Sequence, residues 1–463
     1  MDRSSSRGRV AAVSLGCAKN LVDTEILLGH LREAGYEVVG EVDADTLLIN
    51  TCAFVEEARK ESVDAILEGV AKKEQGALRR LLVAGCLVQR SGPELAQELP
   101  EVDAFVGLDD LSRVGTLVEL GSGSVPVGPS HQVFDHTEPR LLSTRNYAYL
   151  KIAEGCNNPC TFCAIPQWRG RFRSRSVSSL VVEAQQLEAG GARELILIAQ
   201  DTTRYGEDLG YGRHGLRILL ERLLSETSFP WIRFLYAYPT TLDPEVLTLM
   251  GSESRLVPYL DIPLQHSHPK ILRAMRRGGS GERYLRLLEL ARERVPGLFV
   301  RTTFIVGFPG ETEEEFQHLL DFVARARFDH VGAFVFSPEE STPAAALPDR
   351  PSPVVARRRY RQLLARQRPI SLESRKRLVG KVVPVLVEGP CQETELLLEG
   401  RHAGMAPEVD GRVLLRDGRA RPGEFVSVLV ERAYAADLVG RIVGSAAFEV
   451  DVPGVSRLGA VGS

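Results

Sequence analysis

The stretch Asn146–Arg171, which reads NYAYLKIAEGCNNPCTFCAIPQWRGR, determines how the rest of the chain is interpreted. Its apolar and aromatic start, Tyr147–Ile152, predicts a strand, and the Gly, Asn and Pro residues after it predict a loop. This loop contains Cys156, Cys160 and Cys163, spaced C-x3-C-x2-C. Three thiols this close together indicate a metal site.

Two kinds of metal site compete for these cysteines. Zinc usually takes four protein ligands in a structural site, and the nearest histidines, His131 and His136, precede the predicted strand. A [4Fe–4S] cluster held by three cysteines instead keeps one iron open, because such clusters usually have four cysteine ligands. An open iron could chelate a small molecule, which is a chemical reason for having three cysteines. The loop therefore favours an iron–sulfur cluster over zinc.

Composition narrows the class of protein. A chain of 463 residues can form two or three domains. Its 57 Lys and Arg residues against 61 Asp and Glu residues give no global basic charge for nucleic acid. No apolar run approaches the length of a membrane span, and the first residues lack the apolar segment of a secretory signal. The chain has seven cysteines, most of them clustered as metal ligands are, which predicts reduced thiols and therefore a cytoplasmic protein. We expect no membrane partner, because no span is predicted.

Residues 8–120 predict a first α/β domain, in which strands and helices alternate and the sheet is parallel. Strands are expected at Arg9–Leu15, Asp45–Asn50, Arg80–Ala84 and Ala104–Val106. Cys17, Cys52 and Cys86 each lie at the end of one of the first three strands. Because ligand sites lie outside the carboxyl ends of parallel strands, we expect these cysteines to converge on a second cluster. The alternative is three separate buried thiols.

Residues 142–375 predict a second α/β series. It follows a linker at Leu120–Ser143 that is rich in Gly, Pro, Ser and His, and within this linker Val125–Val127 could be extended. Strands are expected at Tyr147–Ile152, Glu194–Ala199, Trp231–Tyr236, Tyr259–Ile262, Phe299–Ile305 and His330–Phe336. Six such units predict an incomplete (β/α)6 barrel. Its chemistry should lie at the carboxyl ends of the strands.

Several residues at these strand ends have two interpretations. Gly307 and Glu311, in GFPGET, could contact a cofactor through closely approaching backbone, or could form only a turn into a helix. His266 and His268 could act in catalysis or simply cap a loop. The sequence identifies no catalytic residue. The arginines of RGRFRSRS favour a solvated basic loop over a binding site for substrate or electron donor. They are Arg169, Arg171, Arg173 and Arg175.

Residues 376–445 predict a third unit, a small antiparallel β-barrel built from short strands between Gly, Pro and Asp turns. Between Lys376 and Arg441 there are ten basic and ten acidic residues. An RNA-binding barrel usually carries a basic excess, so this balance favours a protein partner. Cys391 belongs to no sequence pattern that would supply a partner for its thiol, and we expect this thiol to have no function.

This order of parts, with the C-x3-C-x2-C loop after a strand, resembles the methylthiotransferases of the radical S-adenosylmethionine enzymes over nearly the whole chain. The resemblance implies an N-terminal cluster domain, a radical core and a terminal TRAM domain. It implies two [4Fe–4S] clusters, one on Cys17, Cys52 and Cys86 and one on Cys156, Cys160 and Cys163. It also implies S-adenosylmethionine as methyl donor and radical source, a sulfur carried on the first cluster, and an external electron donor.

The family has two main branches, which modify an adenosine of tRNA or the β-carbon of an aspartate in small-ribosomal-subunit protein S-twelve. The chain is similar to the second branch in SLGCAKNLVDTE around Cys17, in YLDIPLQHSHPKILRAMRR from Tyr259 and in ADLVGRIV near the end. It departs at Thr24, where Ser is usual, and at Gly278, where Pro is usual. A tRNA methylthiotransferase is the alternative. A non-enzymatic zinc or cluster scaffold that recruits ribosomal components is a further one.

Overall fold

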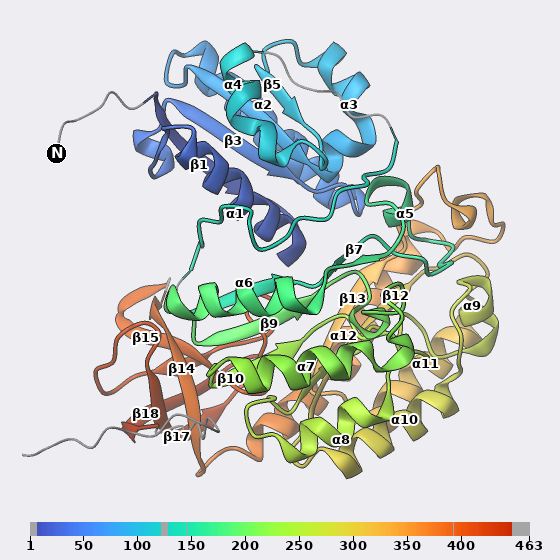
Figure 1. Cartoon of the computed structure of the whole chain (residues 1–463). Helices are drawn as coiled ribbons and strands as arrows, with labels where there is room; N and C mark the ends of the chain where they lie inside the picture. The colour runs from blue at the N-terminus through green and yellow to red at the C-terminus, as the bar shows by residue number, and fades with distance from the viewer. Residues whose placement is uncertain (1–6, 122–127, 145, 392, 447–463) are drawn as a thin grey trace, which may run out of the picture.

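The fold is described from a computed structural model, which covers residues 7–121, 128–144, 146–391 and 393–446 (Figure 1). Three regions follow one another along the chain: an N-terminal domain, a central barrel and a C-terminal barrel. In this part of the chain, no helix combines the length and apolar character needed to cross a membrane.

The N-terminal domain is a parallel five-stranded sheet in the order β2-β1-β3-β4-β5. Its strands are β1 Arg9–Ser14, β2 Glu37–Val38, β3 Thr46–Thr51, β4 Arg80–Gly85 and β5 Ala104–Val106, and its helices are α1 Ala18–Glu33, α2 Glu56–Glu74, α3 Cys86–Glu98 and α4 Val114–Leu120. The four predicted strands are confirmed. β2 was not predicted, because two residues at a sheet edge, one of them exposed, leave no hydrophobic pattern.

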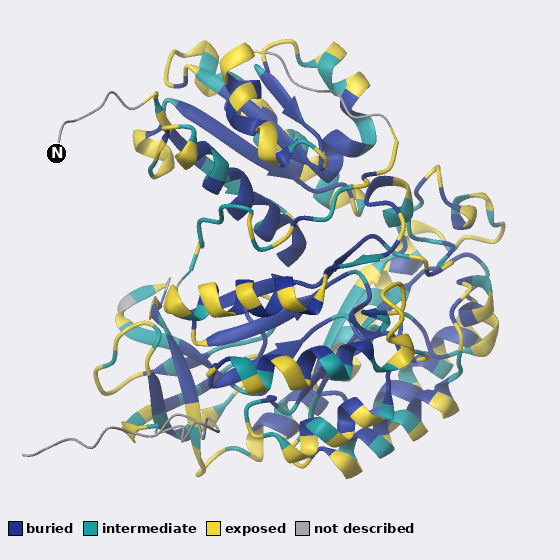
Figure 2. Ribbon diagram, in the orientation of Figure 1, coloured by how far each residue is buried: buried dark blue, intermediate teal, exposed yellow. Residues whose placement is uncertain are grey.

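Helix α1 lies between the N-terminal sheet and the central barrel, and its burial pattern reflects this position (Figure 2). Lys19, Asn20, Asp23, Thr24 and Glu25 are all buried, although each is polar or charged. Buried polar groups must find partners, so a polar face on α1 predicts a polar interface with the next domain.

The central barrel has two parallel three-stranded sheets, β10-β9-β6 and β11-β12-β13. The Ala237 N–H donates to the Asp261 carbonyl (2.9 Å), which joins the two sheets just beyond β10 and β11. The six strands therefore follow chain order, with no pairing of β6 with β13 in the described residues, and the incomplete (β/α)6 barrel is confirmed. Its strands are β6 Tyr147–Lys151, β9 Glu194–Ile198, β10 Trp231–Phe234, β11 Tyr259–Asp261, β12 Phe299–Val306 and β13 His330–Val335, with a small pair β7 Ala153–Glu154 and β8 Arg173–Ser174.

Helices cover the outside of the central barrel (Figure 1). They are α6 Val177–Ala189, α7 Gly215–Glu226, α8 Pro244–Ser252, α9 Pro269–Ala274, α10 Gly281–Arg294, α11 Glu313–Ala326 and α12 Pro353–Lys376. The short helix α5 Ile165–Trp168 instead packs against the N-terminal domain. Residues Val125–Val127 of the predicted linker lie outside the described residues. The later part of that linker packs against the domains, because Arg140 pairs with Glu25 of α1 (2.6 Å) and Glu183 of α6 (2.8 Å).

The C-terminal barrel is closed, in the order β14-β15-β16-β18-β17. Its strands are β14 Val382–Cys391, β15 Thr394–His402, β16 Val413–Leu415, β17 Phe425–Ala433 and β18 Leu438–Ser445. One pair, β16 with β18, is parallel, so the barrel is not wholly antiparallel as predicted. β16 and β18 run in the same direction because β17 returns the chain between them.

The C-terminal barrel contacts the amino ends of the central strands. Glu194, at the start of β9, accepts from Arg401 (2.7 Å), and Tyr259, at the start of β11, donates to Asp410 (2.6 Å). The opposite, carboxyl ends of the central strands consequently face the N-terminal domain, through α1. A site at those ends lies between two domains.

Candidate functional site

The three cysteines of the loop after β7 form the loop triad, Cys156, Cys160 and Cys163. The Cys156 N–H donates to the Gly170 carbonyl (3.1 Å), and the Cys163 N–H donates to the Cys160 carbonyl (3.2 Å). Gly155 precedes the first cysteine with φ +71°, and a Cβ there would lie 2.1 Å from the Arg171 carbonyl oxygen. Only glycine fits this turn, so the loop is held in one conformation around its thiols.

Protein surroundings keep the thiols of Cys156 and Cys163 protonated when no metal is bound. Burial raises the pKa of Cys156 to about 11 and that of Cys163 to about 12. The Arg277 Nη1 lies 3.5 Å from the Cys160 Sγ and donates to it. Thiolates bind metals and thiols do not, so metal binding here releases protons, and one guanidinium stabilises the resulting negative charge.

The strand-end triad consists of Cys17 after β1, Cys52 after β3 and Cys86 after β4. Gly16 and Gly85 have φ +92° and +98°, so Cys17 and Cys86 each follow a glycine in the left-handed region. A Cβ on Gly16 would lie 2.7 Å from the Cys52 Cβ, which shows how closely these strand ends converge. The convergence that the parallel sheet predicts is therefore present.

The electrostatic surroundings of the strand-end triad differ from one cysteine to another. Burial raises the pKa of Cys86 to about 12 and also raises that of Cys52. At Cys17, desolvation is outweighed by the Lys19 ammonium, the Arg169 guanidinium and backbone N–H groups at the start of α1, and the pKa is lowered. Helix N-termini and nearby cations favour thiolates, so Cys17 is the most readily ionised of the three.

The spacing of the sulfur atoms bears on which metal group fits. Within the described ranges, neither triad brings its three sulfurs all within 4.8 Å of one another. Tetrahedral zinc, with Zn–S bonds of about 2.3 Å, would place sulfurs about 3.8 Å apart. A four-iron cluster binds its cysteines at separate corners. The wider spacing suits a cluster better than zinc at both triads.

Arg169 connects the two triads. It belongs to the central barrel, yet its Nη2 lies 3.3 Å from the Cys86 Sγ and 2.8 Å from the Asp23 Oδ2, both in the N-terminal domain. Its Nη1 lies 3.1 Å from Glu154, beside the loop triad. The expectation of a solvated basic loop is wrong for Arg169, which is only 2% exposed. The reason is that α1 supplies the carboxylate and amide partners that a buried guanidinium requires.

Lys151 completes this interdomain network by pairing with Asp23 (2.5 Å) and Glu154. Burial alone would raise the pKa of Glu154, but Lys151 and Arg169 lower it to about 2. Lys151, Arg169 and Glu154 therefore remain charged in the seam between the domains. Breaking one member of such a buried set leaves an uncompensated charge.

The strand-end residues predicted from sequence have internal partners. Glu311 accepts from the Gly307 N–H (3.0 Å) and from Arg359 (2.8 Å), and a Cβ on Gly307 would lie 2.5 Å from the Ala356 Cβ in α12. His268 caps α9, since its Nδ1 accepts from the Lys270 N–H (3.3 Å). Turn formation and packing thus account for these residues, and cofactor contact by Gly307 and Glu311 stays a prediction.

Two side chains at the same strand ends, Gln200 and His266, have buried polar atoms without a hydrogen-bond partner in the described residues. Neither amide atom of Gln200, directly after β9, has a hydrogen-bond partner in the described residues, although both atoms are buried. The Nε2 of His266 is also buried and unbonded, with Glu311 3.7 Å away. Unpaired buried polar atoms are costly, so this face is built to receive a polar ligand. AQDTTRYG was noted as unusual, but nothing in the sequence singled out Gln200.

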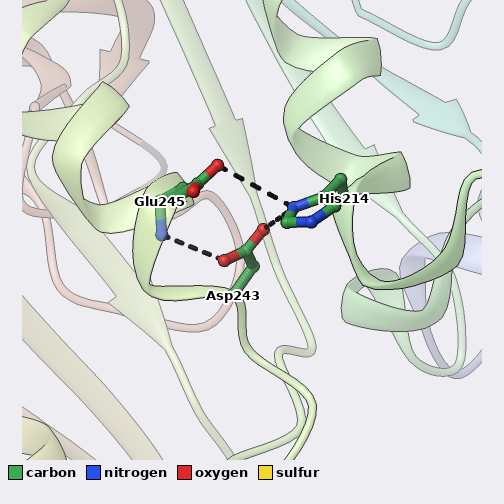
Figure 3. Close-up of side chains that lie close together, drawn as sticks. All are labelled: His214, Asp243 and Glu245. Carbon is green, nitrogen blue, oxygen red and sulfur yellow. Dashed lines mark hydrogen bonds and ion pairs between the residues drawn. The ribbon is translucent and has the colours of Figure 1, made fainter.

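A different group of possible metal ligands lies on the outside of the barrel (Figure 3). The His214 Nδ1–H donates to the Asp243 carboxylate (2.8 Å), and Asp243 caps α8 by accepting from the Glu245 N–H (3.1 Å). Arg217 pairs with Glu245 (3.1 Å), and Arg213 lies 3.6 Å from Asp243. Because arginines already neutralise these carboxylates, the group is a helix cap with ion pairs.

Comparisons with known families agree with this division of the chain. Residues 150–323 match the radical SAM superfamily, residues 9–107 match an uncharacterized protein family, UPF0004, and residues 379–443 match the TRAM domain. Among solved structures, the chain resembles TsrM, a radical S-adenosylmethionine methyltransferase from Kitasatospora setae solved with cobalamin and a [4Fe–4S] cluster. The TM-score is 0.55 at 16% identity, covering 74% of this chain and 77% of that one. At this identity the likeness shows the fold alone.

Curated relatives extend over almost the full length. The chain is 48% identical over 434 residues to the ribosomal protein uS12 methylthiotransferase RimO of Myxococcus xanthus, covering 93% of this chain and 91% of that protein. It is 45% identical over 444 residues to the protein of the same name from Trichlorobacter lovleyi, covering 95% and 99%. The chain therefore belongs to the RimO family of radical S-adenosylmethionine methylthiotransferases.

Proposed function

We propose that this protein adds a methylthio group to the β-carbon of an aspartate in ribosomal protein uS12. The observation that carries the proposal is the pair of cysteine triads on two domains, which meet across one buried network through Arg169. Relatives at 44–48% identity that carry the uS12 methylthiotransferase name support the choice of substrate.

We propose one [4Fe–4S] cluster on each triad, Cys17, Cys52 and Cys86 on one side and Cys156, Cys160 and Cys163 on the other. The sulfur spacing and the convergence of the strand-end cysteines support this assignment. When bound, the clusters and S-adenosylmethionine supply a carbon radical and the sulfur for transfer. The radical can break a C–H bond whose acidity is too low for general-base catalysis. Gly307 and Glu311 remain our proposed contacts for S-adenosylmethionine.

The side chains of this chain bind and orient the reacting groups, and they exclude water. Arg169 and Arg277 each donate to one cysteine sulfur, at 3.3 and 3.5 Å, and such bonds raise the reduction potential of a cluster. The unpaired amide of Gln200 is placed to accept or donate to a polar ligand at the strand ends. The buried seam of Asp23, Lys151 and Glu154 keeps bulk water away from the space between the triads.

The C-terminal barrel favours a protein substrate over tRNA. Several of its arginines pair with neighbouring carboxylates: Arg412 pairs with Glu399 and Glu393, each at 2.6 Å, and Arg416 and Arg441 pair with Glu431. A surface that binds a phosphate backbone needs free cations. We therefore place tRNA second as a substrate, and we propose a cytoplasmic protein, acting on uS12 and supplied with electrons by an external donor of unknown identity.

We also propose that the functional units are residues 8–120, 142–375 and 376–445, which carry the strand-end triad, the loop triad and the TRAM-like barrel respectively.

Mass spectrometry of uS12 from cells with and without the gene tests the proposal. We expect a methylthio mass increment on one aspartate that disappears with the gene. If the increment persists, the substrate assignment is wrong, and digested tRNA from the same cells is the next sample. A purified protein that holds zinc, has no colour and leaves S-adenosylmethionine intact would instead identify a scaffold.

A further inference from the structure

The segment directly after β10 carries two aromatic rings, each covered by a cation next to a different triad. The Lys19 Nζ lies 3.3 Å from the centroid of the Tyr236 ring, and Lys19 is two residues beyond Cys17 of the strand-end triad. The Arg277 Cζ lies 4.2 Å from the centroid of the Tyr238 ring, and Arg277 donates to Cys160 of the loop triad. This short segment therefore lies between the two triads.

The backbone of Tyr236 is held in an unusual conformation. Its φ is +62°, in the left-handed region that a bulky aromatic residue rarely adopts. Its N–H donates to the Asp261 Oδ2 (2.9 Å), and its carbonyl accepts from the Thr202 N–H (3.2 Å). Strain of this kind persists at functional sites where neighbours fix it, and here it fixes the ring beneath Lys19.

Lys19 has a different set of partners from the other buried cations of the seam. Lys151 and Arg169 both pair with Asp23 and Glu154. Lys19 is 8% exposed, and no carboxylate of the described residues lies within 4.0 Å of its ammonium; the acidic groups that interact with it electrostatically are Cys17 and Asp261. A buried charge is costly without an anionic partner, and a ring face replaces only part of one.

We propose that Lys19, seated on Tyr236, binds the side-chain carboxylate of the substrate aspartate. This inference rests on the proposed function and deepens it, because it names the residue that recognises the substrate side chain. The reacting β-carbon is bonded directly to the carboxylate carbon, so an ion pair at Lys19 holds that carbon in the space between the triads. A neutral nucleobase carries no negative charge and so could not form an ion pair with this ammonium.

Binding of purified uS12 and of its variant with the target aspartate changed to asparagine tests the proposal, using the cluster-loaded full-length enzyme. With the wild-type enzyme, we expect the asparagine variant to bind about 30-fold more weakly, the value for about 2 kcal/mol from a desolvated ion pair. With Lys19→Met, both forms of uS12 should bind equally and weakly. Lys19→Arg should restore part of the preference for aspartate.

Two further measurements separate recognition from structural damage. Lys72→Met is the matched control, because Lys72 is exposed and far from the triads in an ion pair with Glu41 (3.3 Å), and it should leave the preference intact. Cluster content and uncoupled cleavage of S-adenosylmethionine are measured in every variant, because a loss of either marks structural damage and not lost recognition. In turnover, Lys19→Met should raise KM for uS12 more than it lowers kcat.

A Lys19→Met enzyme that still prefers aspartate about 30-fold would overturn this inference and leave the proposed function standing. A wild-type enzyme that never modifies uS12 would overturn both. If Lys19→Met loses its clusters, the wild-type comparison of aspartate with asparagine and the Lys19→Arg variant still decide the question, because equal wild-type binding of the two forms contradicts the ion pair.

Discussion

The two cysteine triads reach similar chemistry by opposite routes. The loop triad lies within one short segment, whose turn is fixed by Gly155 and by local hydrogen bonds. The strand-end triad is assembled from three strands, so it exists only when the whole parallel sheet has formed. The first depends on local backbone geometry, and the second depends on the tertiary fold.

The triads also differ in where their arginine donor comes from. Arg277, next to Cys160, belongs to the same central barrel as the loop triad. Arg169, next to Cys86, comes from the central barrel and crosses to the N-terminal domain. The loop triad is therefore self-contained, whereas the strand-end triad is complete only when the two domains are in contact.

The largest expected effect comes from removing a ligand on either side. We expect Cys52→Ala and Cys160→Ala each to abolish methylthiolation and to lower iron content by about half, because each removes a ligand of one of the two four-iron clusters that we propose. Only Cys160→Ala should also abolish cleavage of S-adenosylmethionine. Iron analysis and product assays measure this, with Cys391→Ala as the control that changes neither. Full activity in either ligand variant, with unchanged iron, would refute the assignment.

The second prediction separates the two arginines. Arg169→Gln should destabilise the protein by about 3–5 kcal/mol, because it leaves buried carboxylates without a partner, and it should lower the reduction potential of the strand-end cluster. Arg277→Gln should lower only the potential of the loop cluster. Redox titration followed by electron paramagnetic resonance, with denaturant unfolding, measures both effects. Identical shifts at both clusters would contradict separate donors.

A third prediction uses glycines that precede cysteines. Gly16→Ala should cost about 2–4 kcal/mol, from left-handed strain and a clash with Cys52, and should release iron from the strand-end triad alone. Gly155→Ala should do the same at the loop triad. Gly76→Ala is the control, because its φ is +76° and a Cβ there meets nothing within 4 Å. It should cost about 1 kcal/mol and leave the iron content unchanged.

The smallest effect is expected at the helix cap of His214, Asp243 and Glu245. Asp243→Ala should lower the free energy of unfolding by about 1 kcal/mol, the usual value for a lost N-cap. Added zinc should leave the Tm of the cluster-loaded wild-type protein unchanged. Stabilisation by zinc that disappears in Asp243→Ala would show that this cap is a metal site.

Strand positions and the convergence of Cys17, Cys52 and Cys86 could be predicted from the sequence, because buried parallel strands are continuous apolar runs with a shared carboxyl edge. The role of Arg169 could not be predicted. Its partners Asp23 and Asn20 are more than 140 positions away, and a short arginine-rich segment has the same local pattern in solvent or in an interface. The parallel pairing of β16 with β18 likewise depends on barrel closure.

The interdomain position of Arg169 also bears on how the protein is made. Domains generally fold as units during synthesis, with the N-terminal one first. All three strand-end cysteines have been synthesised by residue 86, but their arginine donor follows 83 residues later. The N-terminal domain can thus fold on the ribosome around its own cysteines, and its sulfur environment changes when the central barrel docks. Docking of the nascent domains is therefore the step that brings the two proposed cluster sites together in the enzyme.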